Sequence, residues 1–329
     1  MRLQHTIDLV LSLDAEKFNK LMNRIHGNLE YIDDNRFVDQ TLTPKGITIT
    51  YHGKQYKKKV QFTVNANAIL DGDEPNKDNA DRLVRKLEKR IEGYFNSKYA
   101  LDDFDVNGVS LITDIDVRSR EKVSAYIKIL QRLGKIKGFM PTRKDWFSDD
   151  VCFWLEGNSN YTEFMICDLE NLLLTQSRKA DSETGKELKR LSKKAEGLLR
   201  TEVKLTKPKA IRDYTDATST SAQIADLSGK IQQIFLDTFM RVVPFGDFYK
   251  KDKAVDIIRA KVSDMKIRRR ALRLVALIAE KKSLLLAQKT LIYKRIDEVM
   301  EAFSDIELSP ITISKRHDIK RLDNLYKYM

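Results

Sequence analysis

Two stretches of the chain decide its fold: NGVSLITDIDV at residues 107–117 and LLRTEVKL at residues 198–205. Apolar and polar residues alternate in both. Because side chains point alternately to the two faces of a strand, each stretch predicts a β-strand with one apolar and one polar face. The polar faces carry Asp114 and Asp116 from the first stretch and Arg200, Glu202 and Lys204 from the second. Helices are expected to cover the apolar face.

The remaining sequence predicts two kinds of structure. Further strands are expected at 6–13, 47–51, 59–65, 151–156 and 161–168, with helices after Asp14, over 76–99 and after Ser119. From about residue 209 helical periodicity takes over, at 224–242, 251–262, 264–281 and 284–303. The prediction is an α+β chain: an antiparallel-sheet domain over 1–208 with helices on one face, and an α-helical domain over 209–329.

The charge of the chain points to an anionic partner. The 329 residues carry a formal net charge of +12 and a pI near 9.4. Residues 250–282 contain 12 Lys and Arg against 4 Asp and Glu, and residues 178–209 contain 11 against 5. These two segments hold more than the whole excess, a distribution that favours a local docking surface for a polyphosphate such as DNA. The alternative is that long helices simply have solvated charged faces.

Other features of the sequence argue against a membrane or secreted protein. No run of 18 or more apolar residues is present, and Asp8 interrupts any apolar core of a signal peptide. The two cysteines, Cys152 and Cys167, do not form a disulfide framework or a CxxC zinc motif. We therefore expect a cytoplasmic protein in a reducing compartment.

The carboxylates of the polar sheet face suggest a metal site. Asp114 and Asp116 share one strand face, and like charges so close are unfavourable unless a cation lies between them. Carboxylates that converge from separate strands could hold Mg²⁺ or Mn²⁺. The alternative is the ordinary wet side of an antiparallel sheet.

Several stretches in collinear order resemble the gene II/X type of replication initiators of filamentous phages and related plasmids. They are TIDLVL at 6–11, VQF at 60–62 followed by NANAILDG at 65–72, the pair Ile115 and Asp116, Trp154 before a Gly/Asn turn at 157–160, and GLLRTEV at 197–203. The resemblance covers roughly the first 210 residues, and SPITIS at 309–314 is also similar to the ends of family members.

The resemblance implies a rolling-circle initiator related to the HUH endonucleases. Such proteins nick one strand of supercoiled origin DNA with a tyrosine, stay attached to the 5′ phosphate and later rejoin the strand, using one divalent metal. A phosphotyrosine retains the phosphodiester energy, so closure needs no ATP. A host helicase is an implied partner, since the sequence contains no Walker A motif.

The sequence departs from this family at its nucleophile. Cys167 stands where the family has tyrosine, and an ordinary cysteine is only a few per cent thiolate at neutral pH. Tyr161, six residues earlier, is expected on the same strand face but about 20 Å away. By the match of 197–203, Arg200 is expected near phosphate and Glu202 near the metal, with salt-bridged sheet residues as the alternative. No His-hydrophobe-His pair exists, so the metal ligands would come from Asp114, Asp116, Glu202 and Gln61.

The helical tail is compatible with a DNA reader. Two helices over 266–281 and 284–303, followed by a possible extended wing at 306–314, match a helix-turn-helix or winged-helix order, although generic helical hairpins share it. The expected phosphate contacts are Lys204, Lys266, Arg268, Arg269, Arg270 and Arg273. Three functions are thus predicted: an origin-nicking initiator, a catalytically inactive DNA-binding relative of one, or an RNA-binding or generic basic scaffold.

Overall fold

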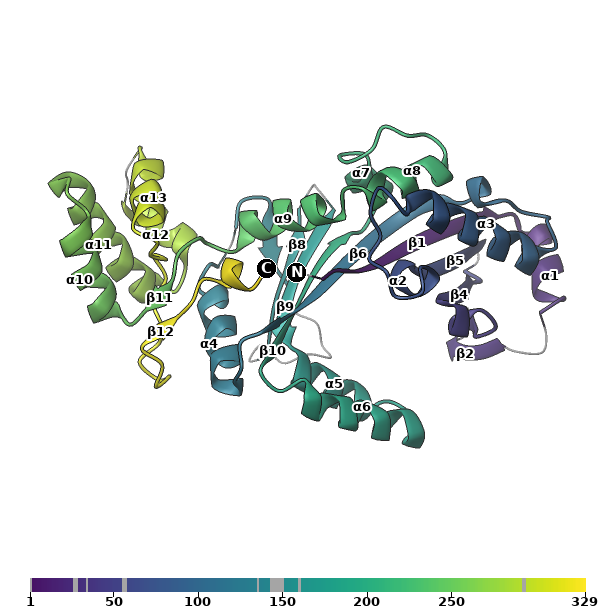
Figure 1. Ribbon diagram of the computed structural model, residues 1–329, viewed down its shortest axis with the longest axis horizontal. Coiled ribbons are helices and arrows are strands. Elements are labelled where there is room, and N and C mark those ends of the chain that lie inside the picture. The colour runs from purple at the N-terminus through teal and green to yellow at the C-terminus, as the bar shows by residue number, and fades with distance from the viewer. Residues whose placement is uncertain are drawn as a thin grey trace.

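The computed structural model describes residues 2–25, 29–33, 35–54, 58–134, 136–142, 151–158, 161–291 and 294–329. Within them, ten strands form one antiparallel sheet in the order β2-β3-β4-β5-β1-β6-β10-β9-β8-β7, which runs along most of the molecule (Figure 1). Its strands are β1 (Gln4–Leu13), β2 (Leu29–Asp33), β3 (Arg36–Asp39), β4 (Ile47–His52), β5 (Lys58–Asn65), β6 (Asp105–Asp116), β7 (Phe139–Pro141), β8 (Cys152–Gly157), β9 (Thr162–Asp168) and β10 (Leu198–Leu205). The mixed α and β composition and the antiparallel sheet are as predicted, although β2, β3 and β7 were not expected.

Helices and short 3₁₀ turns connect and cover the strands. The first part of the chain contains α1 (Ala15–Met22), α2 (Ala66–Ile69), α3 (Ala80–Phe95), α4 (Arg120–Gln131), α5 (Leu169–Ser177), α6 (Ser182–Lys194), α7 (Pro208–Ile211), α8 (Thr220–Ser228) and α9 (Ile231–Val242), with η1 (Thr43–Lys45) and η2 (Leu101–Asp103). The last part contains β11 (Phe248–Tyr249), α10 (Lys251–Lys261), α11 (Met265–Lys281), α12 (Leu284–Leu291), α13 (Ile296–Asp305), β12 (Arg321–Leu322) and η3 (Leu325–Tyr328).

The main core lies between the apolar sheet face and its helices. Phe62 of β5 is fully buried and packs against the rings of Phe95 on α3 and Phe104. Leu83, Leu87 and Ile91 continue the same α3 stripe and are also fully buried. Burial of each such side chain contributes roughly 1.5–3 kcal/mol, so the spacing-four stripe of the sequence fixes α3 on this face.

The opposite face is not free of helices, which corrects the prediction that helices cover one face only. The hairpin of α5 and α6 packs over the end of β9 and β10, where Leu169, Leu172 and Ala195 form a small second core with Met165 and Cys167. Figure 1 shows α5 and α6 on the other side of the sheet from α7–α9. The rest of this face, along β5, β1 and β6, keeps the polar residues that the alternation predicts.

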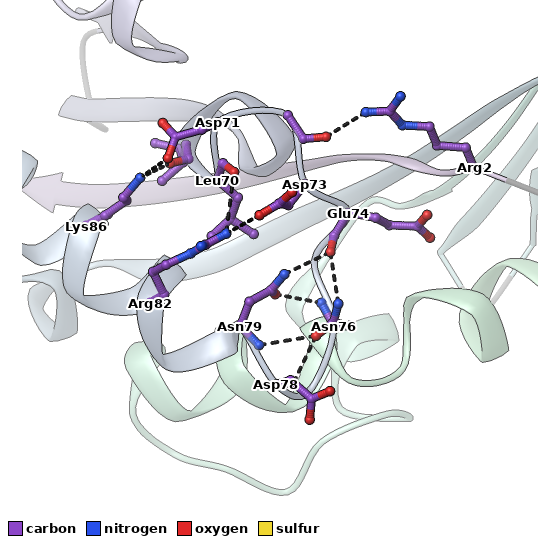
Figure 2. A network of polar contacts seen from close by, with 12 residues as sticks. Arg2, Leu70, Asp71, Asp73, Glu74, Asn76, Asp78, Asn79, Arg82 and Lys86 are labelled. Carbon is purple, nitrogen blue, oxygen red and sulfur yellow. Dashed lines mark hydrogen bonds and ion pairs between the residues drawn. The ribbon is translucent and has the colours of Figure 1, made fainter.

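Local sequence signals set several helix ends. The side chains of Asp14, Ser119 and Asp264 accept backbone N–H bonds as N-caps of α1, α4 and α11. The helix expected over 76–99 is shorter, because Asn76 and Asn79 bind backbone and each other in the loop before α3 (Figure 2). At its other end, Asn96 adopts a left-handed φ of 51°.

A helical domain was predicted from residue 209, but the first helices of that segment still pack on the sheet. Helices α7, α8 and α9 pack on β6, β9 and β10, and α10–α13 stand together beyond the β7–β8 end (Figure 1). The reason is that the apolar stripes of α8 and α9, including Ile224, Phe235 and Phe239, cover the sheet. The C-terminal segment returns to this region, where the Tyr126 hydroxyl donates to the Asp323 carbonyl.

Three other expectations for the tail need correction. The helix expected over 224–242 is two helices that are separated at Gly229 and Lys230, and the one expected over 284–303 is α12 and α13. Residues 306–314, expected as an extended wing, form only isolated bridges, of Leu308 with Asp247 and of Ile313 with Lys250. Residues 292–293, and 159–160 of the expected Gly/Asn turn, lie outside the described residues. No described helix is both long and apolar enough to cross a membrane.

Candidate nucleic-acid interface

The polar face of the central strands holds an ion pair. Arg200 of β10 lies directly opposite Asp114 of β6, and its Nε and Nη2 atoms are each 2.8 Å from one carboxylate oxygen of Asp114. Burial alone would lower the pKa of Arg200, but the hydrogen bonds and charge of Asp114 outweigh it and raise that pKa. The structure thus brings together two predicted site residues, and the guanidinium of Arg200 and the carboxylate of Asp114 are bound to each other.

Glu202 and Lys204 extend this face toward the other end of β10. The Ser110 hydroxyl donates to Glu202 Oε1 at 2.5 Å, and Lys204 lies between Ser110 and Glu163 in the strand register. All of these side chains are half-buried or buried. Their polar groups have polar partners or neighbours within the sheet, which agrees with the alternative that these are structural residues of the polar face.

Cys167 is placed where it cannot attack DNA. Its side chain is fully buried beneath α5 and α6, and it lies opposite Cys152 of β8. Burial raises the pKa of the Cys167 thiol well above its ordinary value, so the group stays protonated at neutral pH. The prediction of Cys167 as nucleophile is therefore corrected: strand alternation pointed it to the polar face, and the α5–α6 hairpin covers that part of the face.

Tyr161 is separated from Cys167 and does not share its face. It has a φ of 51°, which interrupts the extended chain just before β9, and its partly buried ring packs against the main core. The ammonium nitrogen of Lys207 lies 4.2 Å from the ring centroid and that of Lys209 lies 5.7 Å from it. The expectation from alternation fails because a left-handed residue reverses the direction of the side chain.

The four predicted metal ligands do not converge. Asp116 lies opposite Leu198 and Glu202 opposite Ile112, four residues away along β6, or about 13 Å at 3.3 Å per residue. Gln61 lies opposite Val10, at the other end of the sheet face. Asp116 Oδ1 accepts the backbone N–H of Arg118, and Asp114 is held by Arg200. In the described part of the chain, no three His, Cys, Asp or Glu side chains group closely enough to hold a metal. The predicted set does not fit a single ion.

A different polar group on the same face was missed from the sequence. Asp8 of β1 lies opposite Thr63 of β5, and its Oδ1 accepts a 2.8 Å bond from the Thr63 hydroxyl and a 3.2 Å bond from the Gln61 amide. The TIDLVL sequence contains a hint of this group, since the polar Asp8 lies between the buried residues Ile7 and Leu9 and so points to the polar face. The signal becomes visible only when the register of β1 and β5 is known.

The predicted DNA-contacting residues of the tail lie in the first half of α11. Lys266, Arg269 and Arg273 are exposed and recur at three- and four-residue spacing, which puts them on one face of the helix. Cations near a helix N-terminus oppose the helix dipole, an arrangement that a bound anion relieves. We call Lys266, Arg269 and Arg273 the α11 stripe.

Arg268 and Arg270 differ from their neighbours. Arg268 donates from Nε to the Val262 carbonyl and from Nη2 to the Ser263 carbonyl, so it caps the end of α10. The Arg270 side chain is half-buried. The expectation that both arginines contact phosphate is not supported for Arg268, whose donors bind backbone carbonyls.

A second row of cations lies on α6. Lys186, Lys189 and Lys193 are exposed, again at spacings of three and four, and we call them the α6 stripe. The helix packs closely against α5, because Gly185 approaches the Ser177 carbonyl so nearly that a Cβ there would lie 2.8 Å from the oxygen. The sequence showed the charge excess of this segment but not its helical arrangement.

Comparison with known proteins adds no family assignment, because neither the family models nor the curated proteins searched give a match to this chain.

Proposed function

We propose that this protein binds DNA, as a relative of the replication initiators that its N-terminal sequence resembles, and that binding is its principal activity. The observation that carries the proposal is the pair of exposed cationic stripes, on α6 and on α11, in a chain with net charge +12. Neither stripe forms ion pairs with carboxylates in the described residues, whereas Arg190, beside the α6 stripe, is paired with Glu187.

Charge rows of this kind suit the phosphate backbone. Each phosphate neutralised by a lysine or arginine releases condensed counterions, so affinity falls steeply with salt. The two stripes stand on separate helices, so each can contact phosphates of DNA independently of the other. Contacts of this kind position a protein on DNA without reading its sequence.

The test measures fluorescence anisotropy of labelled single-stranded and duplex DNA against salt concentration. The triple variants Lys266→Gln, Arg269→Gln, Arg273→Gln and Lys186→Gln, Lys189→Gln, Lys193→Gln should each weaken binding. Each should also lower the slope of log K against log salt by about 0.9 for every duplex phosphate that the variant no longer neutralises. The matched control, Lys20→Gln with Lys54→Gln and Lys77→Gln, removes three exposed lysines elsewhere. Binding weakened as much in the control as in the stripe variants would contradict the proposal.

Single-strand nicking is the second candidate function, and it needs a nucleophile other than Cys167. Tyr161 supports it, because its ring is partly accessible and lies beneath two ammonium groups that would attract a phosphate. The resemblance implies a divalent ion for this reaction, and it would have to be held close to Tyr161, because the oxygen atoms of Asp8, Gln61 and Thr63 lie on the other face of the sheet. A helicase partner belongs to this candidate alone.

A denaturing gel separates the two functions. Supercoiled plasmid and 5′-labelled single-stranded DNA are incubated with the protein and Mn²⁺, and covalent protein–DNA adducts are counted. Under the principal proposal DNA is bound and no adduct forms. An adduct that persists in Cys167→Ala and disappears in Tyr161→Phe establishes nicking instead, and a Ser12→Ala variant at an exposed position of the opposite sheet face controls for general disturbance.

A further inference from the structure

A cavity of about 980 Å³ opens beside α3, at the end of the sheet farthest from α10–α13. Its walls come from α1, η1, the end of β3 and the second half of α3. Its volume is within the range of pockets that bind small organic ligands, and one side of it is widely open to solvent. It lies apart from both cationic stripes and from the polar sheet face.

The cavity rim is strongly cationic. Among the described residues that line it, six are basic and one is acidic: Arg24, Lys45, Lys86, Lys89, Arg90 and Lys98, with Asp39. The acid is already satisfied, because Asp39 is 1% exposed and accepts bonds from the Tyr94 hydroxyl and the Thr41 N–H. An anionic ligand would therefore meet an excess of positive charge.

Two of these basic side chains, Lys86 and Arg90, already bind other groups of the protein. Lys86 Nζ lies 2.5 Å from Asp71 in the loop before α3, as Figure 2 shows, and Arg90 donates to the Lys45 carbonyl at 2.7 Å. The exposed ammonium groups of Lys45 and Lys89 have no carboxylate within ion-pair distance in the described chain. They stand on different elements, η1 and α3, and both line this cavity.

The floor of the cavity is apolar and aromatic. Ile25 and the Tyr94 ring line it and are half-buried, with Leu21, Leu42 and Phe95 of the main core behind them. Gly93 of α3 also lines it, and a Cβ at Gly93 would meet nothing within 4 Å, so the space beside the helix is open. A purely inorganic anion would leave this apolar surface uncovered.

From the cationic rim, the apolar floor and the volume together, we infer that this cavity binds a nucleoside phosphate, with the base on the floor and the phosphate between Lys45 and Lys89. The same chemistry occurs in a free nucleotide and at the 5′-phosphorylated end of a DNA strand. The inference does not rest on the proposed DNA binding, because no residue of the two stripes lines the cavity.

Isothermal titration calorimetry of the full chain tests the inference. The ligands are ATP, deoxyadenosine monophosphate and a 5′-phosphorylated oligonucleotide, with adenosine and inorganic triphosphate as partial ligands. Lys45→Gln with Lys89→Gln should weaken nucleotide binding at least about tenfold. Arg85→Gln removes an exposed cation of α3 that does not line the cavity and should leave affinity unchanged.

A second pair of variants tests the floor independently of charge. Gly93→Phe should fill the open space and abolish nucleotide binding, whereas Gly93→Ala should retain it, and circular dichroism checks that both fold. Binding of the free nucleotides alone would support the site and identify a free nucleotide as its ligand. Binding of the phosphorylated oligonucleotide alone would support the site and identify a DNA end as its ligand. Absence of binding by all three, triphosphate as tight as ATP, or unchanged affinity in Gly93→Phe would overturn the inference. Loss of DNA binding in the stripe variants with nucleotide binding intact would separate the two proposals.

Discussion

Arg200 and Asp114 face each other across β10 and β6, with two hydrogen bonds of 2.8 Å between the guanidinium and the carboxylate. Both side chains are about a quarter exposed, so the pair is only partly screened by water. The ion pair joins adjacent central strands and neutralises two residues that the sequence assigned to a reaction centre. Its measurable role is therefore in stability.

Breaking this pair should destabilise the fold. Arg200→Gln and Asp114→Asn are each expected to lower the free energy of unfolding by about 1–3 kcal/mol, because each leaves a charged partner partly buried without its bonds. The double variant should be destabilised by less than the sum, as measured by urea denaturation of all four proteins. Strict additivity would show that the two side chains do not interact.

Cys167 should be unreactive in the folded protein. Its thiol is fully buried and its pKa is raised by burial, so iodoacetamide at pH 7.5 should label it at a rate limited by unfolding. Half-buried Cys152 provides the internal comparison. Rapid native labelling of Cys167, located by peptide mass spectrometry, would refute its placement under α5 and α6.

His5 should make the protein sensitive to acid. Both ring nitrogens are buried and have no hydrogen-bond partner among the residues that the structure describes, and burial lowers the pKa of His5 from 6.5 to about 4. The unfolded chain therefore takes up a proton more readily, and stability present above pH 6.5 is lost as pH falls toward 4. Between pH 7.5 and 5 this amounts to about 2 kcal/mol.

A His5→Leu variant checks the origin of this dependence. The backbone N–H of His5 keeps its bond to Asn67 Oδ1, so the β1 strand is retained. Urea denaturation at pH 7.5 and 5 should show a smaller difference between the two pH values than in the parent protein. A difference as large as the parent's would assign the acid sensitivity to other groups.

Gly93→Ala should stabilise α3. Glycine inside a helix costs about 0.5–1 kcal/mol relative to alanine, and the added Cβ meets no atom within 4 Å. Thermal denaturation should show a higher midpoint. Gly185→Ala is the contrasting control, because its Cβ would lie 2.8 Å from the Ser177 carbonyl oxygen and should destabilise the α5–α6 hairpin.

The strands and most helix starts followed from local sequence. Alternation in 107–117 and 198–205 corresponds to β6 and β10, and Asp14, Ser119 and Asp264 mark helix starts through side chains that bind nearby backbone N–H groups. These signals act within a few residues, so the sequence carries them directly. The α6 helix was not predicted, because its segment is mostly charged and Leu188 and Leu191 are its only large apolar residues.

The candidate site depended on contacts that local patterns do not contain. Alternation gave Cys167 and Glu202 a common face, but it carried no information about a helical hairpin folding over Cys167. Alternation also does not say which residues of neighbouring strands lie opposite each other. That register places Asp116 far from Gln61 and Asp8 next to Thr63.

The sequence by itself determined the alternating strands, the capped helices and the two concentrations of positive charge, because each depends on spacing along the chain. Tertiary structure alone decided which polar groups meet, which thiol is hidden, and that Lys45 and Lys89 face one cavity. Those outcomes depend on how segments distant in the chain pair and pack, and the lowest free energy of that packing is a property of the whole molecule.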